Sequence, residues 1–166
     1  DDSKKLSPET RERLFDEVKA RAVTWGIGEA QPDEVDRLNP YHAGILAMSR
    51  ALHALDPRPE HVLLDARKVP DFDVPQTPII KGDALSHTIG AASILAKVHR
   101  DRLMVRYDAQ YPGYGLAEHK GYPVAAHVEA LMRLGPCPIH RRSYRPVREA
   151  MGIAPVQHDL FGGRRS

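Results

Sequence analysis

Two aspartates, Asp65 and Asp101, lie at positions where a carboxylate could bind a cation. In "SILAKVHRD" (93–101), helical spacing places Asp101 on the same stripe as Ile94 and Val98, so that its side chain faces the core. An ionised carboxylate buried alone costs several kcal/mol, so we expect it to be ion-paired or to bind a cation. Asp65 ends the apolar run "HVLL", at the edge of an open α/β sheet where ligands bind. Both residues are therefore candidates for chemistry.

Together, the two carboxylates could share a Mg²⁺ ion, which prefers oxygen ligands. Two such ions, roughly 4 Å apart, would clamp the attacking water and the leaving oxygen of a phosphodiester, although two carboxylates are too few to hold both. The simpler alternatives are a salt bridge from Asp101 to Lys97 or Arg100, and a turn that begins at Asp65.

Two later segments have the composition of a nucleic-acid surface. "YPGYGLAEHKGY" (111–122) combines tyrosines, a histidine and a lysine that could stack on sugars or bases and contact phosphates. "PIHRRSYRPVRE" (138–149) adds a cluster of arginines that is compatible with a phosphate backbone. The alternatives are tyrosines that cover the core and an ordinary charged surface.

Composition places these residues in one domain. The chain has 166 residues, 42% of them hydrophobic, and no apolar stretch long enough for a membrane span or a signal peptide. Cys137 is the only cysteine, which fits a reducing compartment, and we expect a cytoplasmic monomer without a membrane. Residues 1–85 hold more acidic than basic side chains and residues 86–166 reverse this balance, which suggests a polyanionic substrate handled at a cation-binding centre.

Strands that alternate with helices predict an α/β layered fold. Caps and apolar spacing predict helices that begin at Ser7-Pro8 and at Asn39-Pro40. Two further helices are predicted at about 86–107 and 123–134, and strands at 23–28, 61–65 and 79–82, the middle one buried on both faces.

Taken in order, the motifs resemble those of type 2 ribonuclease H (ribonuclease HII), over residues 1 to about 150. Seven ordered motifs carry the resemblance: "DSKKLS" (2–7), "HVLLD" (61–65), "KGDALS" (81–86), "AASILAKVHRDRLM" (91–104), "YPGYG" (111–115), "HKGY" (119–122) and "GPCPIHRRSY" (135–144).

The resemblance implies a ribonuclease H-like domain over 1–150, with a mixed central sheet flanked by helices, and a loose tail at 151–166. It implies Mg²⁺- or Mn²⁺-dependent hydrolysis of RNA in RNA–DNA hybrids and cutting at single ribonucleotides in duplex DNA, with 3′-hydroxyl and 5′-phosphate ends. The family's last two metal-binding acids are matched to Asp65 and Asp101, which would be catalytic. Substrate contacts are matched to Lys4, Lys97, His119, Lys120 and Tyr122.

Departures from the family pattern lower the expected activity. The family's first two acids lie in an Asp-Glu-Ala-Gly-Arg-Gly motif on its first strand, and this sequence begins at "DDSK" without it. We therefore expect an N-terminally truncated chain that lacks the first strands of its sheet and has little or no activity alone. Smaller departures are Ala66 in place of a usual glycine, His42 in place of an amide and Val124 in place of threonine.

Two other functions remain open. The chain could be a noncatalytic nucleic-acid-binding module, whose binding would be metal-independent and unaffected by Asp65→Asn or Asp101→Asn. It could also be a different two-metal nuclease on the same fold, such as one that resolves DNA junctions. Only the ribonuclease reading requires a 2′-hydroxyl in the substrate.

Overall fold

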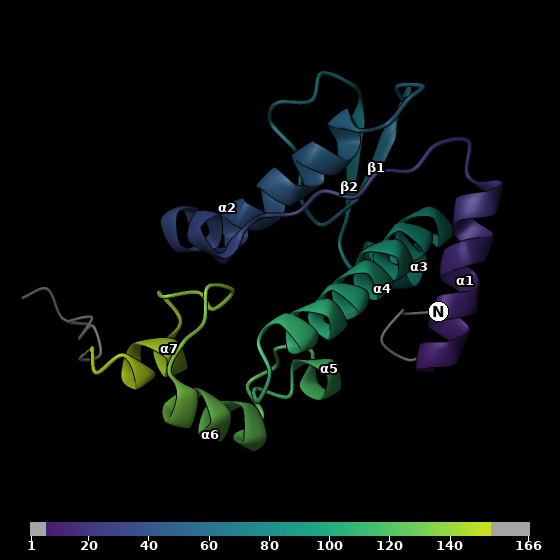
Figure 1. Ribbon diagram of the computed structural model, residues 1–166. Helices are drawn as coiled ribbons and strands as arrows, with labels where there is room; N and C mark the ends of the chain where they lie inside the picture. The colour runs from purple at the N-terminus through teal and green to yellow at the C-terminus, as the bar shows by residue number, and fades with distance from the viewer. Residues whose placement is uncertain (1–5, 154–166) are drawn as a thin grey trace, which may run out of the picture.

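A long helix, α4, runs through the middle of the molecule (Figure 1). The computed structural model describes residues 6–153. Its elements are α1 (Pro8–Arg21), α2 (Pro32–His53), β1 (Val62–Asp65), β2 (Gln76–Ile79), α3 (Gly82–Leu85), α4 (His87–Gln110), α5 (Leu116–His119), α6 (Ala125–Leu134) and α7 (Arg145–Ala150). In the view of Figure 1, α2 and the two strands lie above α4, and α5, α6 and α7 lie around its lower end. No described helix is both long and apolar enough to cross a membrane.

Helices α1 and α4 pack side by side, and both begin where the sequence predicts. The Ser7 hydroxyl accepts a hydrogen bond from the Thr10 N–H at 3.2 Å, which satisfies one of the free donors in the first turn of α1. Phe15 of α1 is buried against Ile94 and Val98 of α4, the apolar stripe recognised in the sequence. The predicted helices at 86–107 and 123–134 are confirmed as α4 and α6.

The helix start predicted at Asn39-Pro40 lies inside α2, where the helix is kinked. Asn39 has a positive φ of 67°, outside the helical range, and the chain then continues through Pro40. The Asn39 side-chain oxygen accepts hydrogen bonds from the N–H groups of Tyr41 and His42, at 2.9 and 3.1 Å. The second half of α2 is thus capped as a separate helix would be.

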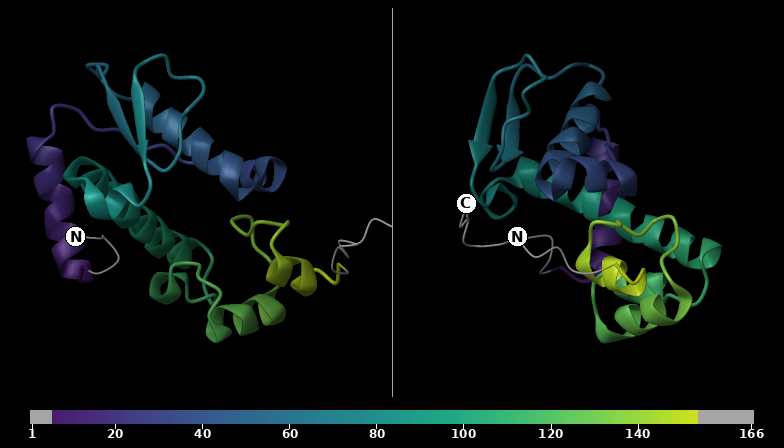
Figure 2. Two further views of the ribbon diagram at one scale, coloured as in Figure 1. Left: turned by 180° about the vertical axis from the view of Figure 1, so that it is seen from behind. Right: turned by 90° about the vertical axis from the view of Figure 1, so that its left-hand side faces the viewer.

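The sheet of the described residues is a parallel pair, β1 and β2, that packs against α2 (Figure 2). Val62 and Leu64 face α2 and form a core cluster with Met48, Leu52, Val69, Phe72 and Val74. The alternate residue Leu63 is 38% exposed, so the prediction that β1 is buried on both faces is wrong: its side chains alternate between buried and exposed. The second strand, predicted at 79–82, ends at Ile79, because the chain turns there into α3.

The segment 23–28, predicted as a strand, is extended but pairs with no described strand. It lies along α2 instead. A Cβ on Gly26 would come within 2.6 Å of the Ala51 carbonyl oxygen, and one on Gly28 within 2.0 Å of the Ala47 carbonyl oxygen. The two glycines permit this backbone-to-backbone approach, so packing on the helix replaces strand pairing. Most of the predicted tail, residues 154–166, lies outside the described residues.

Candidate active site

Asp65 lies at the carboxyl end of β1, where the parallel strands point towards α3 and the start of α4 (Figure 1). Its side chain is exposed, and its Oδ1 accepts a hydrogen bond from the Gly82 N–H at 3.0 Å. The next residue, Ala66, has a φ of +62° and donates its N–H to the Ile79 carbonyl oxygen at 2.9 Å. This is the position at which the family usually has glycine, the residue that tolerates such a φ without cost.

The residue that follows the backbone partner of Asp65 is a further acid, Asp83. Asp83 directly follows the Gly82 N–H that Asp65 binds, and consecutive Cα atoms are about 3.8 Å apart. This acid belongs to the motif "KGDALS" but was not among the residues predicted to bind a metal. The signal was available: a residue that follows the second of two parallel strands meets the end of the first at one sheet edge.

Asp101 lies in a different environment. Its Oδ1 is 2.6 Å from the Lys97 ammonium, one helical turn earlier on α4, and its side chain is 18% exposed. The stripe that buries Ile94 and Val98 leaves the core at this point, since Val105 is 49% exposed. The salt bridge to Lys97, the simpler of the two readings, is therefore present. That Asp101 also shares a metal ion with Asp65 stays a prediction.

Four of the predicted substrate residues line one groove of about 610 Å³, together with Asp101. Residues of α1, of α4 and of the segment 118–124 line the groove. The four are Lys97, His119, Lys120 and Tyr122. Asp65 is not among the described residues that line it, and Lys4 lies outside the described residues.

The turn at 119–122 is held to its surroundings by backbone hydrogen bonds. Arg100 of α4 donates to the Lys120 carbonyl oxygen at 3.1 Å. His127 Nδ1 lies 2.9 Å from the Tyr122 carbonyl oxygen, and His119 Nε2 lies 2.8 Å from the Tyr114 carbonyl oxygen. Tyr122 is nevertheless 53% exposed, so the residue is fixed at its backbone and open to a ligand.

Three histidines, His119 at the groove and His127 and His140 behind it, form a chain that was not predicted from the sequence. The rings of His119 and His127 stack with centroids 4.2 Å apart, and His127 Nε2 lies 3.2 Å from His140 Nε2. Burial lowers the pKa of both His127 and His140, so both are neutral at pH 7. Burial also raises the pKa of the Cys137 thiol beside His140. These residues lie within 119–140, but no helical or strand spacing predicts that their side chains meet.

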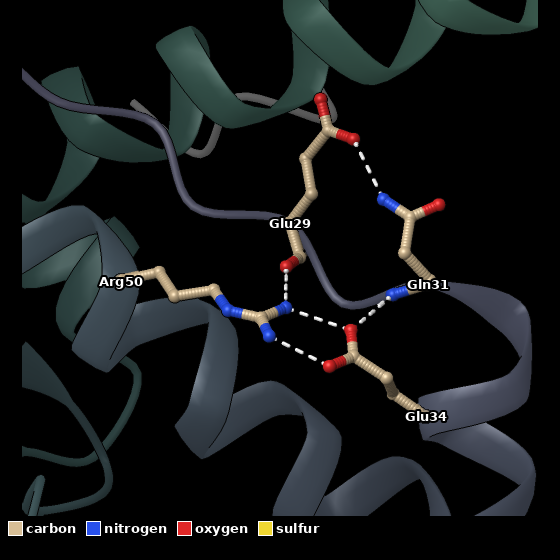
Figure 3. A network of polar contacts seen from close by, with 4 residues as sticks. All are labelled: Glu29, Gln31, Glu34 and Arg50. Atoms are coloured by element: carbon tan, nitrogen blue, oxygen red, sulfur yellow. Dashed lines mark hydrogen bonds and ion pairs between the residues drawn. The ribbon is translucent and has the colours of Figure 1, made fainter.

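A polar network holds the start of α2 against the segment that precedes it (Figure 3). Arg50 donates to both carboxylate oxygens of Glu34, at 2.6 and 2.7 Å, and to the Glu29 carbonyl oxygen. Hydrogen bonds from Arg50 and from the Gln31 N–H lower the pKa of Glu34 to about 2. Glu29 in turn reaches His99 of α4 at 2.5 Å, so the network ties α2 to α4.

The part of the arginine-rich segment that contacts α2 is anchored in a similar way. Asp36 accepts hydrogen bonds from the N–H groups of Arg142 and Ser143, at 2.7 and 2.8 Å, and from the Ser143 hydroxyl. Burial would raise the pKa of Asp36, but these hydrogen bonds outweigh it and the pKa is lowered. Asp36 therefore stays ionised and holds the segment in place.

The site residues suit an open site for a partly hydrated Mg²⁺ or Mn²⁺ ion better than a closed site made of protein ligands alone. Among residues 6–153, no three His, Cys, Asp or Glu side chains are grouped so as to hold a metal ion. Mg²⁺ commonly keeps several waters and binds through one or two carboxylates plus substrate phosphates. The exposed Asp65 and the half-buried Asp83, which lie at one edge of the sheet, fit that chemistry.

Comparison with known proteins identifies the family. The family model "Ribonuclease HII" matches residues 1–147. The chain is 62% identical over 161 residues to a ribonuclease HII of Anaeromyxobacter sp. (strain Fw109-5) and 58% identical over 168 residues to one of Myxococcus xanthus (strain DK1622). These matches cover 97% of this chain but 51% and 57% of the relatives, so the chain spans about half the length of the curated relatives it matches.

A solved structure confirms the predicted fold. The crystal structure of the ribonuclease H2 from Pyrococcus horikoshii OT3 is similar with a TM-score of 0.74 at 24% identity. The match covers 91% of this chain and 79% of that one. The described sheet is limited to β1 and β2, and the fold is otherwise helical. On the evidence of sequence and fold, the chain belongs to the ribonuclease HII family.

Proposed function

We propose that the protein is an endonuclease that hydrolyses the RNA strand of RNA–DNA hybrids and cuts at single ribonucleotides embedded in duplex DNA. The products would carry 3′-hydroxyl and 5′-phosphate ends. Membership of the ribonuclease HII family supports this reaction. The observation that carries the proposal in this chain is the hydrogen bond between Asp65 and the Gly82 N–H, which brings Asp83 to the same sheet edge.

In the proposed mechanism, Asp65 and Asp83 would hold Mg²⁺ or Mn²⁺. When bound, the metal would supply activation of the attacking water and stabilisation of charge on the leaving oxygen. The Gly82 N–H binds one oxygen of Asp65 and so orients the carboxylate, while its other oxygen is left for a cation. The groove supplies the ammonium groups of Lys97 and Lys120 and the imidazole of His119 for the phosphates of the substrate strand, and the exposed Tyr122 for its sugar.

Cleavage of matched duplexes tests this function. Three duplexes of one sequence are compared: an RNA–DNA hybrid, DNA with a single ribonucleotide, and DNA alone. Single-turnover conditions with protein in excess register even slow cutting. The departures from the family pattern predict little or no cutting by this chain alone; any cutting should be confined to the ribonucleotide-containing strands, depend on Mg²⁺ or Mn²⁺, and be lost in Asp65→Asn and Asp83→Asn. The exposed Asp16 of α1 provides a matched control, since Asp16→Asn removes the same charge on a different element.

Two results would contradict the proposal. Cutting of the all-DNA duplex at a similar rate would indicate a nuclease that does not require a 2′-hydroxyl. Metal-independent binding of the hybrid without any cutting, unchanged by Asp65→Asn, would indicate a noncatalytic binding module.

A further inference from the structure

The ion pair between Lys97 and Asp101 differs from the other ion pairs of the same spacing in the described chain. Its side chains are 22% and 18% exposed, whereas those of Arg21 and Glu17 on α1 are 79% and 39% exposed. Water screens an exposed pair almost completely, and a shielded pair retains more of its attraction. The contact at 2.6 Å can therefore restrict the long, flexible side chain of Lys97.

The Lys97 ammonium has a second partner across the groove. It lies 5.6 Å from the centroid of the Tyr122 ring, within the range of a cation–π contact. Tyr122 is held by its carbonyl oxygen, which faces His127 Nδ1 at 2.9 Å, while its ring stays exposed. Asp101, Lys97 and Tyr122 all line the groove, and Lys97 contacts both of the others.

The same contacts argue against Asp101 as a metal ligand. Its Oδ1 is already occupied by an ammonium group, which would repel a divalent cation at the same oxygen. Asp65 has its own hydrogen-bond partner, Gly82, at the sheet edge, and is absent from the described lining of the groove that contains Asp101.

We propose that Asp101 is a positioning residue, which holds the Lys97 ammonium beside the exposed Tyr122 ring so that the two together bind one sugar–phosphate unit of the substrate strand. This inference rests on the proposed function for the identity of the ligand. The placement of Lys97 by Asp101 is independent of that function.

Binding of duplex DNA with a single ribonucleotide, measured by fluorescence anisotropy in EDTA, tests the proposal. Asp101→Asn removes a negative charge, so electrostatics alone predicts tighter binding of a polyanion. Positioning predicts the opposite sign: we expect binding weakened about threefold to tenfold. The slope of log affinity against log salt should fall by about 0.9, the value for one lost phosphate contact, in both Asp101→Asn and Lys97→Ala.

Three variants sharpen the interpretation. Asp101→Glu keeps an acid within reach of Lys97 on the helix and should restore binding. The double variant Lys97→Ala, Asp101→Asn should bind no more weakly than Lys97→Ala, because the aspartate acts through the lysine. Glu17→Gln on α1 breaks an ion pair of the same spacing outside the groove and should leave binding unchanged. Tighter binding by Asp101→Asn, or additive losses in the double variant, would overturn the proposal.

Two further measurements separate this inference from the proposed function. Mn²⁺ affinity should be unchanged in Asp101→Asn and weakened at least about tenfold in Asp65→Asn; equal losses would make Asp101 a metal ligand. In NMR spectra, the ε-methylene of Lys97 should be shifted upfield by the Tyr122 ring and lose that shift in Asp101→Asn. If the wild-type chain binds no duplex, the proposed function fails. An unchanged ring-current shift in Asp101→Asn would refute the positioning role in either case.

Discussion

Replacement of Ala66 by glycine should stabilise the protein. Ala66 directly follows Asp65 and has a φ of +62°, a left-handed conformation that costs a residue with a Cβ about 1–2 kcal/mol. Its side chain is exposed, so removal of the methyl group exposes no buried surface. Glycine loses about 0.5–1 kcal/mol more than alanine when its backbone is ordered. The difference is a net gain of about 0.7 kcal/mol for Ala66→Gly.

Chemical denaturation and calorimetry measure this gain. For a chain of this length, we expect a rise in Tm of about 2 °C. Ala92→Gly is the matched control, because Ala92 is an exposed residue inside α4, where the same change should cost about 1 kcal/mol. The two substitutions should therefore have opposite signs. A loss of stability in Ala66→Gly similar to that in Ala92→Gly would show that residue 66 does not adopt the left-handed conformation in solution.

Three other perturbations test separate parts of the structure. Burial lowers the folded-state pKa of His127 and His140, so their contribution to stability should be fully present above about pH 7. It should be lost as the pH drops through their unfolded pKa near 6.5. Urea midpoints at pH 7.5 and 5.5 should show this loss, and the double variant His127→Gln, His140→Gln should reduce it. Glu34 has a folded-state pKa of about 2, below its unfolded value of 4.5, so its contribution is present above pH 4.5 and is lost towards pH 2; Glu34→Gln should flatten the acid-unfolding curve in that window. Gly28→Ala would place a Cβ 2.0 Å from the Ala47 carbonyl oxygen and should lower stability by about 3 kcal/mol or more, whereas wild-type stability would rule out the close approach of this segment to α2.

Local patterns predicted the helices well. Ser7 and Asn39 cap the helices that they were expected to begin, and the apolar stripe of α4 packs on Phe15 as its spacing required. The strand predicted at 23–28 failed because strand formation depends on a partner, and Gly28 instead brings the segment onto α2. A propensity within one segment contains no information about which neighbour the segment will meet.

The candidate site was only partly predictable for the same reason. Asp65 was found because it ends an apolar run, which is a local signal. The proximity of Asp83 depends on parallel pairing across the crossover at 66–75, in which the Gln76 side chain binds the backbone of Val69 and Phe72. Asp101 was correctly recognised as needing a partner, but periodicity could not say whether that partner was a metal or Lys97.

The histidine chain behind the groove has a direction. The Tyr122 carbonyl can only accept, so His127 carries its proton on Nδ1 and presents a lone pair at Nε2. His140 must then donate from Nε2, which leaves its Nδ1 to accept from the Cys137 N–H, as observed. A change of tautomer in either ring would set proton against proton or lone pair against lone pair. Through this chain of hydrogen bonds the backbone at Tyr122 is coupled to the loop at 137–140, so the two segments can rearrange only together.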